Sequence, residues 1–246
     1  MKPFLWPVFL FLLAACAPSP SSVEISYPSL PAPDRVWEVG FLVMDGVYNT
    51  ELTAPMDMFH HTVFHTEPGM HVFTVAEDSG LIRTFEGLVF QPDFHFDSDS
   101  LPPIDVLVVP SAEHHLDSDL ENERMISWVQ ERAKNASYVL SLCDGAFVLA
   151  KAGLLDDFAS TTFPSDIPTY RKTFPQLEVH EEVLFVHDGK FITSAGGAKS
   201  FEPALYLCER LYGKKAADGI ARGLVIDWNL TEVPHLVVEE ENIPEK

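Results

Sequence analysis

One short stretch near the middle of the chain, residues 136–155, constrains the fold most, because it joins two apolar runs without a loop. Residues 138–142 (YVLSL) form the kind of apolar run found in a strand buried on both faces. Residues 146–155 are apolar on almost every side, as in a buried helix. Only residues 143–145 separate the two runs. The sequence therefore predicts a strand that turns sharply into a helix at Cys143.

A side chain at such a junction is lifted out of the sheet, and acyl-transfer enzymes place a nucleophile at this kind of elbow. The positive end of the following helix can lower the pKa of a thiol and favour the reactive thiolate. The alternative is that Cys143 is a small buried hydrophobe at the end of a strand, as most free cysteines are. The local sequence leaves these two interpretations about equal.

Strand-like and helix-like segments alternate along residues 36–230, which predicts a parallel sheet with helices on both faces. Ligands of such sheets lie beyond the carboxyl ends of the strands. Polar residues follow three of these ends, at 45–51, 111–115 and 143–144, and this convergence favours a functional Cys143. Strands are expected at 36–44, 71–76, 104–110, 138–142 and 160–163, hairpins within 81–96 and 183–194, and helices at 52–64, 120–134, 146–155, 200–212 and 216–228.

The amino end is typical of a bacterial lipoprotein. Residues 1–15 have one lysine and a short apolar core, and residues 13–16 (LAAC) match a lipobox at all four positions. The alternative is a plain signal peptide followed by an incidental cysteine. We expect cleavage before Cys16, lipid on that cysteine, and a Pro/Ser-rich tether over residues 16–35. The protein would then be anchored in a bacterial cell envelope, at the outer membrane or the outer face of the inner membrane, with its domain in the periplasm.

The charge excludes one class of partner. The chain carries 16 Lys and Arg against 37 Asp and Glu, for a formal net charge of −21. Nucleic-acid binding needs clustered basic residues for the phosphates, so no nucleic acid is expected as a partner. We expect a single domain over residues 36–230, followed by an acidic tail over residues 231–246.

Neither a cofactor nor a metal ion is expected. Cys208 lies in a segment with apolar residues at helical spacing and is interpreted as core, although the envelope would permit a disulfide with Cys143. His61 and His65 have the i, i+4 spacing of a metal-binding pair, but no third ligand is evident, so a surface position is the better interpretation.

Together these segments resemble the ThiJ/PfpI (DJ-one) family of the class I glutamine amidotransferase-like superfamily, over about residues 36–228. The branch with isonitrile hydratase and the amino-terminal domain of AraC-type regulators has Cys-Thr/Ser-Gly-Ala at its elbow. Residues 143–146 (CDGA) match three of these four positions. Segments 152–155 (AGLL), 160–162 (STT) and 193–196 (TSAG) fit the same branch. The resemblance implies a flavodoxin-like three-layer α/β sandwich and, since members often dimerise, a homodimer.

The resemblance also implies a partner for the cysteine. In the family, an acid from the loop after the first strand approaches the thiol, and Glu51 takes that place here. A carboxyl held near a thiolate tends to be protonated, to donate a hydrogen bond to sulfur and to serve as a general acid or base. The alternative is an ordinary carboxylate beside the positive end of a helix.

The chain departs from the family pattern at three places. Phe163 replaces a common His, which argues against peptidase or amidase chemistry, and Ser111 starts a segment where relatives have a Gly pair. Asp144 replaces Thr or Ser. It would raise the thiol pKa if it faced sulfur, but we expect a helix N-cap whose side chain bonds its own backbone. His114 or His115 could replace the lost imidazole, although loop histidines usually face solvent.

Two functions from different classes remain. The first is a cysteine-dependent hydrolase or hydratase for a small isonitrile- or glyoxal-like molecule, with Cys143 as the nucleophile and Glu51 handling protons. The second is a non-catalytic ligand-binding or redox-sensing domain related to the sensory domain of AraC-type regulators. The retained Cys143 and Glu51 favour the enzyme, and the missing His and Gly pair favour the sensor. The enzyme is slightly preferred.

Overall fold

The computed structural model describes residues 35–238 of the chain. The predicted signal peptide, the predicted lipidation site Cys16 and the tether up to residue 34 lie outside the described residues, as do residues 239–246. Within the described range, no helix combines the length and the apolar character needed to cross a membrane.

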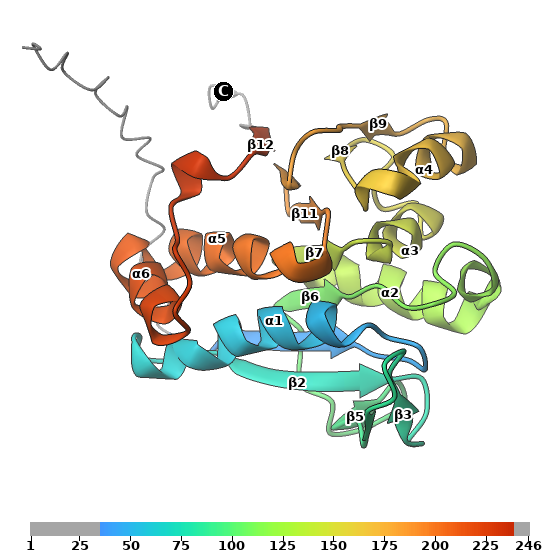
Figure 1. The fold of residues 1–246 in the computed structure, drawn as a ribbon. Helices are drawn as coiled ribbons and strands as arrows, with labels where there is room; N and C mark the ends of the chain where they lie inside the picture. The colour runs from blue at the N-terminus through green and yellow to red at the C-terminus, as the bar shows by residue number, and fades with distance from the viewer. Residues whose placement is uncertain (1–34, 239–246) are drawn as a thin grey trace, which may run out of the picture.

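An eight-stranded sheet runs through the middle of the described chain, in the order β12-β10-β11-β7-β6-β1-β2-β5 (Figure 1). All neighbouring pairs are parallel except β10 and β11, which form an antiparallel hairpin. The predicted flavodoxin-like α/β class is therefore confirmed. The strands are β1 (Glu38–Leu42), β2 (His71–Ala76), β5 (Phe94–His95), β6 (Val106–Val109), β7 (Tyr138–Leu142), β10 (Phe185–Asp188), β11 (Phe191–Ser194) and β12 (His235–Val238).

Helices cover the two faces of this sheet because alternate strand residues point to opposite sides. In β6, Val106 and Val108 pack into one hydrophobic core, and Leu107 and Val109 pack into the other, all fully buried. The first core is closed by α1 (Asn49–His60), α5 (Phe201–Tyr212) and α6 (Lys214–Gly223), and the second by α2 (Glu123–Asn135), α3 (Gly145–Lys151) and α4 (Ile167–Thr173).

Several element boundaries differ from the predictions, and three of the differences are large. The helices expected to reach residues 155 and 228 end at Lys151 and Gly223. The sheet continues past residue 230, where the predicted domain ended, because β12 pairs in parallel with β10. This edge strand has no fully buried side chain, so it lacks the alternation that marks a strand in a sequence.

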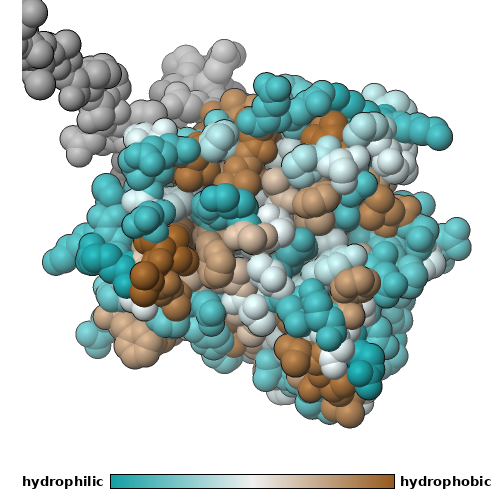
Figure 2. Space-filling model, viewed as in Figure 1, coloured by the Kyte–Doolittle hydropathy of each residue, from teal (hydrophilic) through white to brown (hydrophobic). Residues whose placement is uncertain are grey.

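The predicted 81–96 excursion contains a small antiparallel pair, β3 (Ile82–Arg83) with β4 (Val89–Phe90). Apolar side chains gather at the lower right of Figure 2, where Figure 1 places this hairpin, and further apolar patches lie elsewhere on the same face. The exposed apolar residues of the hairpin are Leu81, Phe85, Leu88 and Val89.

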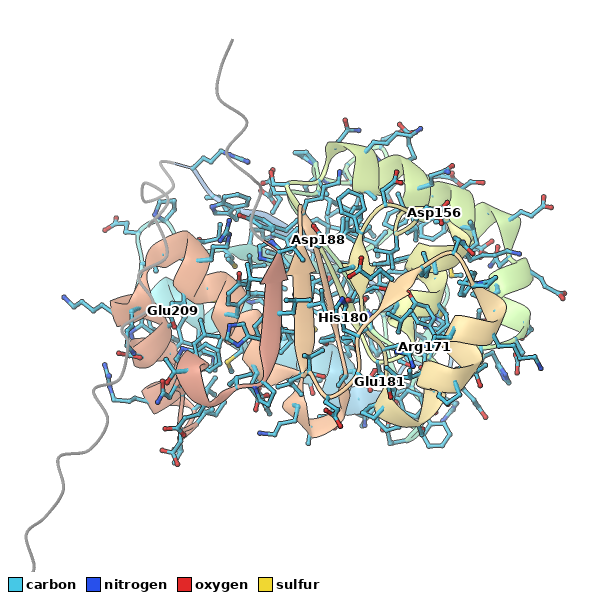
Figure 3. The ribbon with its side chains drawn as sticks, turned by 90° about the horizontal axis from the view of Figure 1, so that it is seen from above. Asp156, Arg171, His180, Glu181, Asp188 and Glu209 are labelled. Carbon is cyan, nitrogen blue, oxygen red and sulfur yellow. The ribbon has the colours of Figure 1, made fainter. Side chains whose placement is uncertain are left out.

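A second small pair, β8 (Ala159–Ser160) with β9 (Glu178–Val179), is tied to the main sheet beside β10. The Asp188 carboxylate at the end of β10 accepts a hydrogen bond from the Ala159 N–H at 2.8 Å. Arg171 of α4 forms an ion pair with Glu181 and donates to the Val179 carbonyl at 2.8 Å (Figure 3). These contacts fix the segment after β8, which reaches the cysteine elbow.

Candidate active site

Cys143 lies at a sharp turn between β7 and α3, as predicted. Its φ of 52° falls in the left-handed region, which is unusual for a residue other than glycine and costs of order 1–3 kcal/mol. Its N–H donates to the Ser194 carbonyl of β11 at 2.9 Å. The neighbouring strand therefore holds the strained turn in place, and strain of this kind is characteristic of functional sites.

Two glycines make room for the turn. A Cβ at Gly145 would lie 2.0 Å from the Val109 carbonyl oxygen, so the start of α3 can approach β6 only without a side chain. Gly196 has a φ of 70°, and a Cβ there would lie 2.5 Å from the Cβ of Cys143. Both contacts involve groups that cannot swing away, which explains why glycine is required on either side of the thiol.

Glu51, in the first turn of α1, contacts Cys143. Its carboxylate accepts the Gly197 N–H on Oε1 at 3.0 Å and the Ser111 N–H on Oε2 at 3.1 Å, and its side chain also forms a hydrogen bond with Cys143. Burial raises the pKa of Glu51, and the two N–H donors oppose this effect. Glu51 does lie at the start of a helix, as the alternative interpretation has it, but it is 5% exposed and its carboxylate bonds Ser111 and Gly197 of other segments.

Asp144 does not cap α3 as we predicted. It occupies the N-cap position, but its side chain makes no capping hydrogen bond. Instead, Oδ2 accepts from the Cys143 thiol at 3.6 Å, and Oδ1 accepts from the Thr162 hydroxyl at 3.2 Å. Burial and then the charge of Asp166 raise the pKa of Asp144 to about 7. The two side-chain donors outcompete the helix backbone for this carboxylate.

The thiol pKa is raised rather than lowered, so the prediction based on the helix dipole is wrong. The largest cause is burial, since only 7% of Cys143 is exposed, and the charges of Glu51 and Asp144 add to it. The Asp144 N–H and the Ser111 hydroxyl oppose the rise without cancelling it. The Ser111 hydroxyl is buried and has no other hydrogen-bond partner among residues 35–238. The resting Cys143 therefore keeps its proton at neutral pH.

The structure does not bring the candidate histidines to the thiol. His114 is more than half exposed, and its Nδ1 lies 3.4 Å from Asp117. His115 is fully buried, accepts from the Ala112 N–H at 3.2 Å and lies beside Met44. Burial lowers the pKa of His115 to about 3, so its ring is neutral. The imidazole missing at position 163 is thus not supplied by either residue.

The His61 and His65 pair is not part of a metal site. Nδ1 of His61 lies 2.7 Å from the Asp57 carbonyl, and the His65 ring packs against Gly219. No group of three or more His, Cys, Asp or Glu side chains within the described range is arranged to hold a metal ion.

Sequence reasoning missed Tyr48, the residue before α1. Burial and then the charges of Cys143, Glu113 and Glu51 raise the pKa of its phenol. Its ring packs on Phe85 of the hairpin at 4.8 Å between centroids. A cavity of about 490 Å³ adjoins this pair and is lined in part by Phe85 and Glu113. An aromatic residue at a helix start carries no sequence signal that separates a site position from a core position.

The molecule is an α/β sandwich whose sheet is mostly parallel. A strained cysteine lies at the elbow between a strand and a helix, and a buried carboxyl from the first helix lies beside it. The chain belongs to the DJ-1/PfpI family, whose model matches residues 38–210.

The similar proteins include an enzyme and transcriptional regulators. Isonitrile hydratase of Pseudomonas putida is 30% identical over 181 residues, which cover 73% of this chain and 74% of the relative. The HTH-type transcriptional regulator CdhR of Pseudomonas aeruginosa is 28% identical over 190 residues, which cover 76% of this chain and 52% of the regulator. The match to the chain thus spans about half of the regulator's length.

Solved structures support the same fold. A THiJ/PfpI family protein from Pseudomonas syringae superposes with a TM-score of 0.69 at 21% identity and covers 88% of this chain and 84% of its own. An AraC family transcriptional regulator from Pseudomonas putida superposes with a TM-score of 0.67 at 21% identity. The superposition covers 76% of this chain and 99% of the regulator structure.

Proposed function

We propose that the protein is a cysteine-dependent hydrolase or hydratase that acts on a small isonitrile- or glyoxal-like molecule, with Cys143 as its nucleophile. The observation that carries this proposal is a thiol held at a strained elbow in hydrogen-bond contact with Glu51. Because only 7% of Cys143 is exposed, a small electrophile reaches the thiol more easily than a peptide does. The similarity to isonitrile hydratase supports the substrate class.

The chemistry needs a nucleophile, a proton carrier and water. With an isonitrile, sulfur bonds to the terminal carbon and the thiol proton is delivered to that carbon, which leaves a thioformimidate on Cys143. Water then adds to this carbon, and departure of the thiol releases an N-substituted formamide. Glu51 is the proposed proton-handling carboxyl beside the thiol, and the Asp144 N–H stabilises negative charge on sulfur. This route requires no imidazole, whereas peptide cleavage would.

The same proposal includes the location and the assembly. The lipobox at residues 13–16 supports lipid on Cys16 and a domain held at the periplasmic side of a bacterial membrane. A homodimer is proposed because members of the family often dimerise. The proposed partners are therefore a small-molecule substrate, a membrane through the lipid, and a second copy of the chain.

A second candidate is a non-catalytic ligand-binding or redox-sensing domain. Two observations favour its ligand-binding form: the raised pKa leaves the Cys143 thiol protonated and unreactive, and the similar proteins include transcriptional regulators. The same raised pKa weighs against the redox-sensing form, because oxidation needs the thiolate. In this role the elbow would bind a ligand, or an oxidant would convert the thiol to a sulfenic acid.

Turnover by the purified full-length protein separates the candidates. A small alkyl isonitrile and methylglyoxal are offered separately, and the formamide or the hydroxy acid is measured by mass spectrometry. Wild type and Cys208→Ala, in which a second buried thiol is removed, are expected to form product, whereas Cys143→Ser forms none. If no variant exceeds buffer but peroxide produces a trappable sulfenic acid on Cys143, the sensor replaces the enzyme.

A further inference from the structure

The proposed function leaves one chemical requirement open. Cys143 must lose its proton as it attacks, yet burial and two carboxyls raise its pKa, and neither His114 nor His115 reaches it. Within the described residues, the groups able to take a proton from sulfur are therefore the carboxyls of Glu51 and Asp144.

Glu51 is the poorer acceptor of the two. Each of its oxygens already accepts a backbone N–H, from Ser111 at 3.1 Å and from Gly197 at 3.0 Å. These donors belong to different segments of the chain and hold the carboxylate from two directions. A proton placed on either oxygen would compete with one of these hydrogen bonds and leave a buried N–H poorly paired, which is unfavourable. The arrangement suits a residue that positions the thiol, so the first proton transfer, which the proposed function gave to Glu51, is better assigned to the other carboxyl, Asp144.

Asp144 has the geometry of an acceptor. Its Oδ2 has the Cys143 thiol as its hydrogen-bond donor, while Oδ1 is held by the Thr162 hydroxyl. Thr162 also donates to the Cys143 carbonyl at 3.0 Å, so one side chain orients both members of the pair. We propose that Asp144 is the general base that takes the thiol proton of Cys143, in the place where an imidazole would otherwise act.

The step balances without any further reactant. As sulfur forms its bond to the electrophilic carbon, the S–H bond breaks, its electron pair stays on sulfur, and the proton moves to Oδ2 of Asp144. The protonated Asp144 then gives this proton to the substrate atom that gained negative charge. The carboxylate is thereby restored before water attacks the intermediate.

The groups around Asp144 support this assignment. Glu51 of α1, Asp166 just before α4 and the phenol of Tyr48 interact electrostatically with the carboxyl, and Cys143 and Thr162 bond to it. Burial and the charge of Asp166, with a smaller effect from Glu51, raise the pKa of Asp144 to about 7. A base with a pKa close to the working pH combines a populated basic form with enough basicity to accept the proton.

The test is the pH dependence of Cys143 alkylation in the full-length protein. Iodoacetamide is used because it is uncharged, and labelling is followed at the Cys143 peptide by mass spectrometry, so Cys16 and Cys208 do not interfere. In wild type the rate should rise with a midpoint near the pKa of Asp144, because thiol and carboxyl lose their first proton as a pair. Asp144→Asn should lose this phase and react roughly 100-fold more slowly near neutral pH.

Whether Asp144→Asn slows or speeds Cys143 alkylation decides whether Asp144 acts as a base or only repels the thiolate. If Asp144 only disfavours the thiolate, its removal lowers the thiol pKa and speeds alkylation, and this result would overturn the proposal. Asp166→Asn is the matched control: it removes a charge that acts on Asp144 without touching sulfur, so the midpoint should move to lower pH with the plateau rate kept.

A second variant keeps the proposal testable if Asp144→Asn does not fold, and comparison with the turnover assay separates the two proposals. If Asp144→Asn does not fold, Thr162→Val removes a hydrogen bond to the carboxylate and should move the midpoint to higher pH; an unchanged midpoint contradicts the proposal. The assignment rests on the proposed function, but the two can fail separately. Alkylation with the expected profile and no turnover of isonitrile or glyoxal removes the substrate class alone, whereas an unreactive wild-type Cys143 overturns both.

Discussion

The Asp144 carboxyl should make the stability of the fold depend on pH. Its pKa is 3.8 as an ordinary aspartate and about 7 when folded, because of burial first and the charge of Asp166 second. A group whose pKa is raised by folding stabilises the native state fully below its unfolded pKa, and this contribution is lost as the pH rises through its folded pKa. Since one pKa unit is worth about 1.4 kcal/mol, the loss from Asp144 amounts to about 4 kcal/mol in all.

Asp144→Asn isolates this effect because the amide stays uncharged at every pH and its oxygen can still accept from Thr162. The free energy of unfolding in urea is measured for wild type and variant between about pH 5 and about pH 8. Across this interval, wild type should lose roughly 2.5 kcal/mol relative to the variant, as the two pKa values require. Profiles that run parallel would refute the raised pKa of Asp144. Asp166→Asn should show a weaker pH dependence than wild type.

Further predictions concern the other parts of the molecule. Glu51→Gln should lower the free energy of unfolding by about 1–3 kcal/mol in urea, because an amide has one acceptor oxygen for two N–H donors; stability equal to wild type would argue against this hydrogen-bond pair. Gly196→Ala should cost about 1–3 kcal/mol more than Gly197→Ala, since both have positive φ but only the first places its Cβ against Cys143; equal losses in urea unfolding would contradict the packing argument. Cys16→Ala should abolish incorporation of labelled palmitate in cells and move the protein from the membrane fraction to the soluble fraction.

Much of the fold could be predicted because its strands and helices carry strong local signals. The strand at 71–76 has the predicted bounds, and the turn at Cys143 follows from two apolar runs with three residues between them. Where the local signal is weak, prediction failed. Helix α4 was not expected, and β12 lies in a segment assigned to the acidic tail.

The sequence predicted which residues form the site better than it predicted their contacts and pKa values. Glu51 and Cys143 meet as the family resemblance implied. The direction in which Asp144 points depends on Thr162, 18 residues away along the chain, and no local pattern reports that contact. The thiol pKa depends on burial and on two carboxyls brought together by the fold, so a rule based on the helix end alone gave the wrong sign.

The position of residue 35 shows where the predicted tether would join the domain. Arg35 pairs with Asp105 at 2.7 Å, just before β6, whereas Cys143 follows the opposite end of the neighbouring strand β7. The chain thus enters the domain on the side away from the thiol. With lipid on Cys16, the tether would join the domain on the side of the sheet opposite Cys143, so its point of attachment would leave the thiol side of the sheet free.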